Sequence, residues 1–295
     1  YRDNADEELY CIPSMSSGSW LAGPLIEARM TVARPVLRLD LPADYLFRSR
    51  LEQQALLDPF MTELEAQLAT LDLDVRYAFG SDFGRVRDLT TGSLLAIEQT
   101  LKRREALAYE LRNVPGDEQK TICRRVLDRV RPRLVGAAFD ATGMGWTVAE
   151  DMGRIFGLRE DPLEGTGLVM AIRFTEEWYR LHMPPLKGAF EDDAIAIIAD
   201  ADHLADLRQV KVIRGIARVP PERTDAQVDA GSGRKRHGDY AIALALADFA
   251  TRMKWAEYGY QPVAPGAAAP AGGPDDDEPR AWWKPPLGAA MRGWL

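Results

Sequence analysis

Three aspartates of this 295-residue chain stand where an apolar segment ends or begins. Asp82 ends the run that starts at position 76, Asp140 ends the run 134–139, and Asp239 opens the apolar stretch 239–257. A buried strand does not carry an aspartate for packing, because an ionised carboxylate needs a charged partner or a metal to offset its desolvation. If the three carboxylates converge, they cannot all stay ionised without cations.

Clusters of carboxylate oxygens suit Mg²⁺ or Mn²⁺. Two such ions, about 3.5 to 4 Å apart, can clamp a phosphodiester for in-line attack by water. The three aspartates therefore predict a site for two Mg²⁺ or Mn²⁺ ions that hydrolyses nucleic acid without a nucleophilic side chain. Each aspartate also has an ordinary interpretation: Asp82 as a turn residue, Asp140 as a cap of the helix after it, and Asp239 as an N-cap. Their joint occurrence at two strand ends and one helix start favours the metal site.

The segments around these aspartates predict an α/β fold with a mixed sheet flanked by helices. Apolar runs of strand length alternate with amphipathic runs of helix length through the middle of the chain. The first three strands are expected to be antiparallel and the later ones parallel, which would bring the ends of the first and fourth strands side by side. The expected elements are strands over 76–82, 93–98 and 106–112, a helix over 115–131, a strand over 134–139, a helix ending at 156, a strand over 168–173 and a helix from about 175.

The flanking regions follow weaker patterns. Helical periodicity over 43–71 is expected to break into two helices at Asp58-Pro59, and one short helix is expected over 23–32. A helix over 195–207 and two antiparallel strands over 210–214 and 215–219 are expected after the central region. The loop 220–236, rich in Pro, Gly, Asp and Arg, then leads to the helix that Asp239 opens.

Basic residues gather in two short segments beside the aspartates. Such residues could contact a phosphate backbone, although solvated loops are an equally good interpretation. Asp88 could serve as a turn residue or as an ion-pair partner of the nearby arginines. The expected DNA-binding residues are Arg85, Arg87, Arg234, Lys235, Arg236 and His237.

The composition sets limits on the protein's class. The formal net charge of -8 argues against a non-specific nucleic-acid coat protein, although much of the acidity is local, as in Asp275 to Glu278. Cys11 and Cys123 show no metal-ligand spacing and predict neither a disulfide scaffold nor a zinc site. We expect a reduced, cytosolic chain without a membrane segment, because no apolar run approaches the roughly 20 residues of a membrane span.

Four motifs together resemble the nuclease domain of phage large terminase subunits, most closely the Mu-like type. They are GSDFGRVRDLT from Gly80, ELRNVPGDEQ from Glu110, FDATGMG from Phe139 and HGDYAIALALA from His237, within residues 75–257. The resemblance implies an RNase H-like fold and metal-dependent cleavage of concatemeric double-stranded viral DNA during packaging, in the host cytoplasm. It places the catalytic acids at Asp82, Asp140 and Asp239, with Asp88 as an additional acid.

The same resemblance predicts the domain organisation and the partners. We expect an N-terminal segment (1–40) leading from an ATPase domain of the same polypeptide, covering helices (41–75), the nuclease domain (76–258) and a flexible acidic, Pro-rich tail (259–295). No GxxxxGK[ST] motif occurs, so this chain is not expected to hydrolyse ATP. The portal and the small terminase subunit are expected partners. A junction resolvase, or a module that docks the motor without cleaving DNA, remains an alternative.

Overall fold

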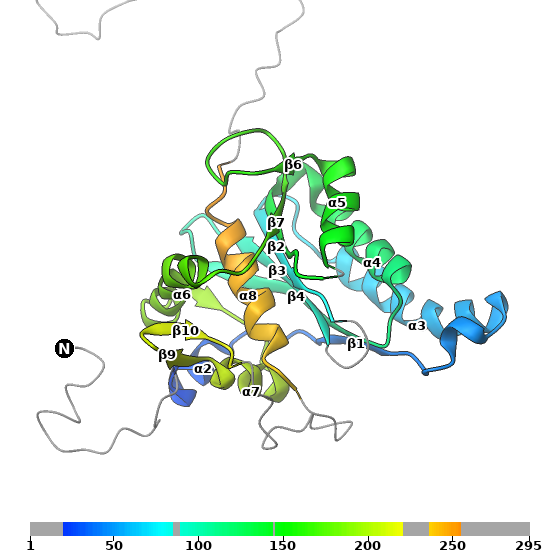
Figure 1. Cartoon of the computed structure of the whole chain (residues 1–295), viewed down its shortest axis with the longest axis horizontal. Helices are drawn as coiled ribbons and strands as arrows, with labels where there is room; N and C mark the ends of the chain where they lie inside the picture. Colours follow the sequence, from blue (N-terminus) through cyan, green and yellow to red (C-terminus); the bar gives the residue numbers. More distant parts are fainter. Residues whose placement is uncertain (1–19, 85–88, 144, 221–235, 255–295) are drawn as a thin grey trace, which may run out of the picture. The chain divides into compact units, whose positions relative to one another are not determined.

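The computed structural model describes residues 20–84, 89–143, 145–220 and 236–254. Compact packing divides the chain after Ala256, and all described residues lie in the first unit. At its centre is an 8-stranded sheet with strand order β1-β4-β3-β2-β5-β7-β6, in which β8 also pairs with β4 (Figure 1). Its strands are β1 (Leu37–Asp40), β2 (Arg76–Asp82), β3 (Thr90–Ile97), β4 (Arg103–Arg112), β5 (Leu134–Asp140), β6 (Leu158–Arg159), β7 (Val169–Ile172) and β8 (Ile195–Ala196).

The strand directions are those that the sequence predicts. Strands β2, β3 and β4 are antiparallel neighbours, whereas β5 runs parallel to β2 and β7 runs parallel to β5. The predicted mixed sheet, with antiparallel strands first and parallel strands after them, is confirmed. Since β2 and β5 are parallel neighbours, both strands end at the same edge of the sheet.

Helices cover both faces of this sheet (Figure 1). One face packs against α3, α4 and α5, and the other against α2, α6, α7 and α8, each with its own hydrophobic core. Residues Lys211–Ile213 and Ile216–Arg218 form the separate antiparallel pair β9 and β10, as expected. The helices are α2 (Gly23–Arg29), α3 (Arg50–Ala69), α4 (Gly116–Val130), α5 (Gly145–Phe156), α6 (Glu176–Glu191), α7 (Ala201–Gln209) and α8 (Asp239–Ala250).

Strand β2 presents large side chains to one face and small ones to the other. Tyr77 and Phe79 belong to the core under α3, α4 and α5, while Ala78 belongs to the core under α8, as the two-residue alternation of a strand requires. Gly80 follows on the α8 side. A Cβ at Gly80 would lie 2.1 Å from the backbone nitrogen of Ala247 and 2.3 Å from the backbone oxygen of Ala243. Helix α8 therefore approaches the sheet so closely that only glycine fits beneath it.

The structure corrects two sequence expectations about helices. Helix α3 runs through Pro59 without the expected break. A capping box between Ser49 and Glu52 holds its start, and Phe60, Leu64 and Leu68 beyond the proline are buried in the core, which offsets the lost backbone hydrogen bond.

The helix expected over 195–207 is shorter and begins at Ala201. Asp200 caps it by accepting hydrogen bonds from the backbone of Asp202 and His203. The apolar residues before Asp200 instead pair as β8 with β4, so they serve the sheet. Strand β1, which also pairs with β4, lies in a segment without a clean sequence period. Of the helices that the structure describes, none combines the length and apolar character needed to cross a bilayer.

We predict that Gly80→Ala lowers the free energy of unfolding by about 1 to 3 kcal/mol, because the added methyl group meets backbone atoms of α8 that cannot rotate away. Gly188→Ala in α6 is the control, since no heavy atom lies within 4 Å of its added Cβ. That variant should be unchanged or slightly stabilised. Denaturant unfolding measures both, and a Gly80→Ala protein as stable as the wild type would contradict the close approach.

Candidate functional site

Two of the predicted aspartates end neighbouring parallel strands. Asp82 is the last residue of β2 and Asp140 the last residue of β5. The register between these strands pairs Ser81 with Phe139, one residue before each aspartate. Both carboxylates therefore lie at the same edge of the sheet. The sequence argument about the first and fourth strands holds for this pair.

The side chains of Asp82 and Asp140 share a hydrogen bond. Asp82 keeps some exposed surface, but burial raises its pKa well above the usual value, and the charges of Asp239 and Asp140 raise it further. Burial also raises the pKa of Asp140, against hydrogen bonds from Thr142. Both carboxyl groups therefore keep a proton to higher pH than a solvated aspartate does.

Local backbone geometry fixes the Asp140 carboxylate. The backbone N–H of Thr142 donates to Asp140 Oδ1 at 2.8 Å, and the N–H of Ala141 donates to the carbonyl of Ile172 at 2.7 Å, which ties the turn to β7. A Cβ at Gly145 would lie 1.9 Å from the Asp140 carbonyl oxygen, so the turn packs closely against the start of α5. The proposed role of Asp140 as a turn or cap residue and its place beside Asp82 are thus compatible.

Asp239 is the first residue of α8 and is 6% exposed. Gly238 before it has a φ of 77°, a conformation that glycine adopts without strain. The hydroxyl of Thr91 donates to the Asp239 carbonyl oxygen at 2.9 Å, and Thr91 is the partner of Asp82 in the β2–β3 register. This contact ties the start of α8 to the strand end that carries Asp82, within range for the Asp239 charge to act on it.

The donor set fits hard divalent cations in its chemistry. All three side chains are carboxylates, and a bound cation would favour the ionised form of Asp82 and Asp140, whose pKa values burial raises. Within residues 20–84, 89–143, 145–220 and 236–254, no three His, Cys, Asp or Glu side chains are already grouped to hold a metal ion. The aspartates thus form a hydrogen-bonded pair and a third charge beside it.

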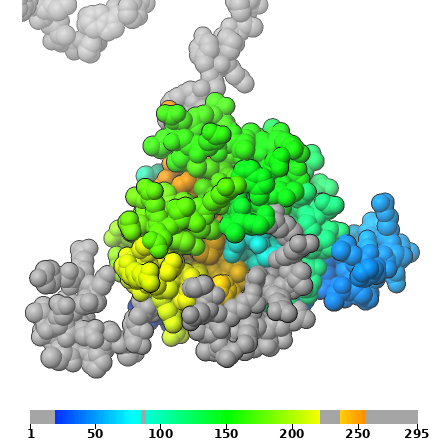
Figure 2. All heavy atoms as spheres, in the orientation of Figure 1, coloured from blue at the N-terminus to red at the C-terminus, as the bar shows by residue number. Residues whose placement is uncertain are grey.

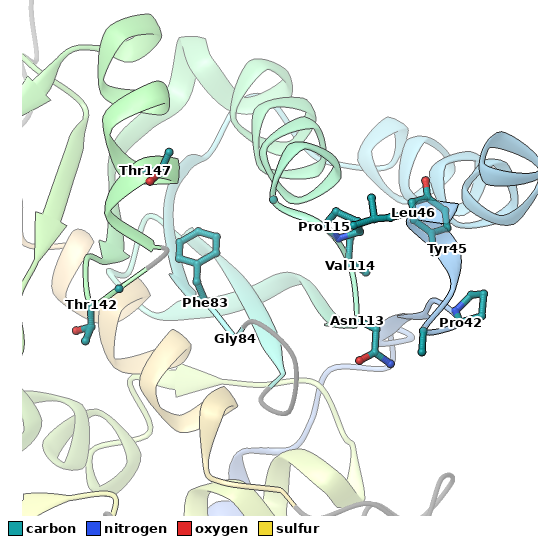
Figure 3. A pocket seen from close by; sticks show the side chains of 13 residues that line it. Pro42, Tyr45, Leu46, Phe83, Gly84, Asn113, Val114, Pro115, Thr142 and Thr147 are labelled. Carbon is teal, nitrogen blue, oxygen red and sulfur yellow. The ribbon is translucent and has the colours of Figure 1, made fainter. Parts of the chain in front are cut away.

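A cleft of about 970 Å³ adjoins the two strand ends (Figure 3). Phe83 and Gly84, which follow Asp82, form part of its lining, as do Thr142 and Gly143, which follow Asp140. In Figure 2 cyan atoms near the end of β2 show between green atoms and the orange atoms of α8, so this part of the sheet reaches the surface on that face. The other lining residues are also uncharged: Pro42, Ala43, Tyr45, Leu46, Asn113, Val114, Pro115, Gly116 and Thr147.

Tyr179 of α6 is a neighbour of the site that the sequence analysis missed. Burial raises its pKa, and the charges of Asp82 and Asp140 raise it further, so its hydroxyl lies within the field of both carboxylates. Its ring stacks on Phe174, with centroids 5.2 Å apart. No local motif marks this tyrosine, because its place near the aspartates depends on how α6 packs into the core that it shares with α8.

The structure describes only two of the predicted basic residues, and it contradicts the expectation for one. Arg236 is 2% exposed, and its guanidinium binds Glu110 and Asp206, so it is not available to contact DNA in this conformation. His237 is half-buried, and its Nε2 has no hydrogen-bond partner among the described residues. Predicted residues outside the described ranges are Arg85, Arg87, Asp88, Arg234 and Lys235.

Two curated relatives match most of this sequence. The chain is 40% identical over 255 residues to "Probable terminase, large subunit gp28" of Escherichia phage Mu, covering 85% of this chain and 44% of that protein. It is 34% identical over 262 residues to "Mu-like prophage FluMu protein gp28" of Haemophilus influenzae, covering 88% of this chain and 49% of that protein. The chain belongs to the Mu gp28-like terminase large subunits.

This family relationship confirms the resemblance expected from the four sequence motifs. The terminase chain spans about half the length of the curated relatives that it matches. No family model matches its sequence. Among solved structures, it is similar to the large terminase nuclease from thermophilic phage G20c with bound magnesium, at 20% identity and a TM-score of 0.42, over 60% of this chain and 82% of that one.

We predict that Asp82→Asn stabilises the metal-free terminase chain at neutral and higher pH. The raised pKa of Asp82 means that the folded state binds its proton more tightly than the unfolded state does, so wild-type stability falls as pH rises from about 3.9 through the folded pKa. An asparagine at this position has no such proton to lose. The free energy of unfolding of the variant should therefore fall less over this pH range than that of the wild type. Chemical denaturation in EDTA at several pH values measures the difference; parallel pH curves would contradict it.

Proposed function

We propose that this chain is a metal-dependent endonuclease domain that cuts concatemeric double-stranded viral DNA during genome packaging. The observation that carries the proposal is the hydrogen-bonded Asp82–Asp140 pair at two adjacent strand ends, with the charge of Asp239 acting on it. The terminase relatives support the DNA substrate, and the magnesium-bound terminase nuclease of phage G20c supports the kind of cofactor.

In this proposal, Asp82, Asp140 and Asp239 hold two Mg²⁺ or Mn²⁺ ions, and Asp88 is a further ligand. Bound ions of this kind lower the pKa of an attacking water and stabilise the leaving 3′ oxygen. The contribution of the chain is to orient its carboxylates: the Thr142 N–H aims Asp140, and the Thr91 hydroxyl holds the start of α8 beside Asp82. The half-exposed Asp82 is where the pair meets solvent and substrate.

The cleft beside the strand ends supplies a place for the DNA strand next to the scissile phosphate. Its described lining carries no formal charge, so it suits sugar and base surfaces, whereas phosphates need cations. We assign the phosphate contacts to Arg85, Arg87, Arg234 and Lys235, which flank the aspartates in sequence. His237, two residues before Asp239, is assigned to this role from its place in the sequence; its Nε2 is buried and would have to turn outward to donate to a phosphate.

The remaining roles follow from the family relationship. An ATPase domain of the same polypeptide would supply the translocation of DNA, and the portal and the small terminase subunit would position the motor. The host cytoplasm is where packaging takes place. In this scheme the chain contributes the cut and no ATP hydrolysis.

We predict that the protein cleaves linear and supercoiled plasmid with Mn²⁺ or Mg²⁺ and not in EDTA. The Asp82→Asn, Asp140→Asn double variant should lose more than about 100-fold in rate, because both strand-end ligands are gone. Asp128→Asn is the control: its carboxylate is exposed on α4 and pairs with Arg124 at 3.3 Å, and its rate should equal that of the wild type.

Two results would count against the nuclease. Folded wild-type protein that leaves DNA intact under every metal would favour the docking module of the packaging motor. Equal cleavage by the double variant would place the cutting site elsewhere or in a contaminant. Preference for four-way junctions over linear duplex, measured in the same assay, would favour the resolvase.

A further inference from the structure

A cluster of buried charges lies under the first turn of α8, next to Asp239, and has no part in the chemistry proposed above. Its centre is the Arg236 guanidinium, whose side chain is 1% exposed. Arg236 Nη2 lies 2.5 Å from Glu110 Oε1 and 2.7 Å from Asp206 Oδ2, and Nε lies 2.9 Å from Asp206 Oδ1. One guanidinium thus binds two buried carboxylates, one from β4 and one from α7.

Asp206 connects Arg236 to the backbone of α8. Its Oδ2 atom, which binds Arg236, also accepts a hydrogen bond of 3.2 Å from the backbone N–H of Tyr240. Tyr240 directly follows Asp239 in the first turn of the helix. The carboxylate of Asp206 therefore holds the backbone at the residue that follows the third predicted ligand.

The Tyr240 side chain is held as firmly as its backbone. Its hydroxyl lies 3.0 Å from Glu105 Oε2, and Glu105 in turn accepts hydrogen bonds from Ser93 at 2.7 Å and from the backbone of Ile198 at 2.9 Å. The His203 ring stacks on the Tyr240 ring, with centroids 3.5 Å apart and planes 9° apart. The first turn of α8 cannot shift without breaking several of these contacts.

The sheet anchors the other side of the cluster. Glu110 belongs to β4, and Arg38 of β1 also binds it, at 2.8 Å. Burial would raise the pKa of Glu110, but hydrogen bonds and charges from His203 and Arg236 outweigh burial and hold that pKa well below its usual value. Glu110 is therefore a fixed negative charge to which Arg236 is tied.

Stability alone is a poor reason for such a cluster. Desolvating several charges costs free energy that their attraction does not reliably return, and apolar side chains of similar volume often serve a core as well. A bidentate arginine does offer a fixed geometry between two carboxylates. The cluster ends on the residue after Asp239, so the geometry that it fixes is that of the proposed metal ligand.

We propose that Arg236 and Asp206 are positioning residues of the proposed metal centre: they hold the first turn of α8 so that Asp239 stays beside Asp82 and Asp140. This inference rests on the proposed function. It also gives Arg236 a different role from the DNA contact expected from the sequence, where it closes a basic run.

The other end of α8 offers a matched control. Asp248 is fully buried there and binds Arg103 of β4 and Arg252. The chemistry is again arginine with a buried aspartate that ties α8 to β4. Asp248 lies nine residues after Asp239, about 13 Å along the helix at 1.5 Å per residue. Loss of this contact should weaken the packing of α8 without moving Asp239 directly.

The test compares Arg236→Lys with Arg103→Lys. Each change keeps the charge. Arg236→Lys removes a fork that holds Asp206 through Nε and Nη2, and Arg103→Lys removes a single contact from Nη1 to Asp248. Mn²⁺ alone is the probe, titrated by isothermal calorimetry against the folded chain, and denaturant unfolding is measured alongside. We expect Arg236→Lys to weaken Mn²⁺ binding about tenfold or more and Arg103→Lys to leave it within about twofold, even where the two variants lose similar stability.

Cleavage provides the second readout. The Mn²⁺ concentration that gives half-maximal plasmid cleavage should rise for Arg236→Lys by the same factor as the dissociation constant, and excess Mn²⁺ should restore the rate. A residue that only stabilises the fold would not be rescued by metal. Asp206→Asn, which keeps the shape of the side chain, should show the same shift, and it replaces Arg236→Lys if that variant does not fold.

The outcomes separate the two proposals. Wild-type protein that binds Mn²⁺, with Arg236→Lys and Asp206→Asn binding it equally well, would overturn the positioning role and leave the nuclease intact. Equal weakening in Arg103→Lys would also overturn it, because the effect would then belong to α8 packing in general. Folded wild-type protein that binds no Mn²⁺ would overturn the proposed metal centre itself.

Discussion

The close approach of α8 to the centre of the sheet is the contact on which the candidate site depends. Two of the three aspartates are brought together by strand pairing alone, since β2 and β5 are adjacent and parallel. The third arrives on a helix whose every residue is buried. Gly80 lets that helix rest on β2 at backbone distance, and the Thr91 hydroxyl ties its first carbonyl to the strand beside Asp82. The approach of Asp239 to the other two acids therefore depends on the packing of α8 against Gly80.

The same packing creates an electrostatic conflict that the fold must tolerate. Asp82 and Asp140 are close enough to share a hydrogen bond, and burial and the charge of Asp239 both raise the pKa of Asp82. Like charges in a partly desolvated site destabilise the folded state unless a proton or a cation sits between them. Burial of apolar side chains in the two large cores, one on each face of the sheet, offsets the cost of this charge repulsion. In the proposed function, bound cations would relieve this conflict.

Sequence reasoning located the aspartates because their signal is local. An apolar run that stops on Asp82 or Asp140 predicts a strand end, and the order of elements then predicts which ends are neighbours. The same reasoning failed for Arg236, because a basic run predicts exposure, whereas the burial of this arginine depends on Glu110, 126 residues away, and on Asp206, 30 residues away. Tyr179 was missed for the same reason. Strand β1 depends on pairing with β4. The unbroken helix at Pro59 depends on the buried residues beyond the proline. Neither dependence is visible in the local sequence pattern.

Arg236 shows that the role of an arginine depends on whether its guanidinium is exposed or buried. An exposed guanidinium at this position would attract phosphate. The buried guanidinium of Arg236 cannot bind phosphate, because its N–H groups already donate to the carboxylates of Glu110 and Asp206. The buried arrangement instead fixes the Asp206 carboxylate, which accepts a hydrogen bond from the backbone N–H of Tyr240, the residue after Asp239. Since one carboxylate binds Arg236 and the Tyr240 N–H together, Arg236 and the first turn of α8 are held as one unit, and in the proposed function that unit sets the place of Asp239.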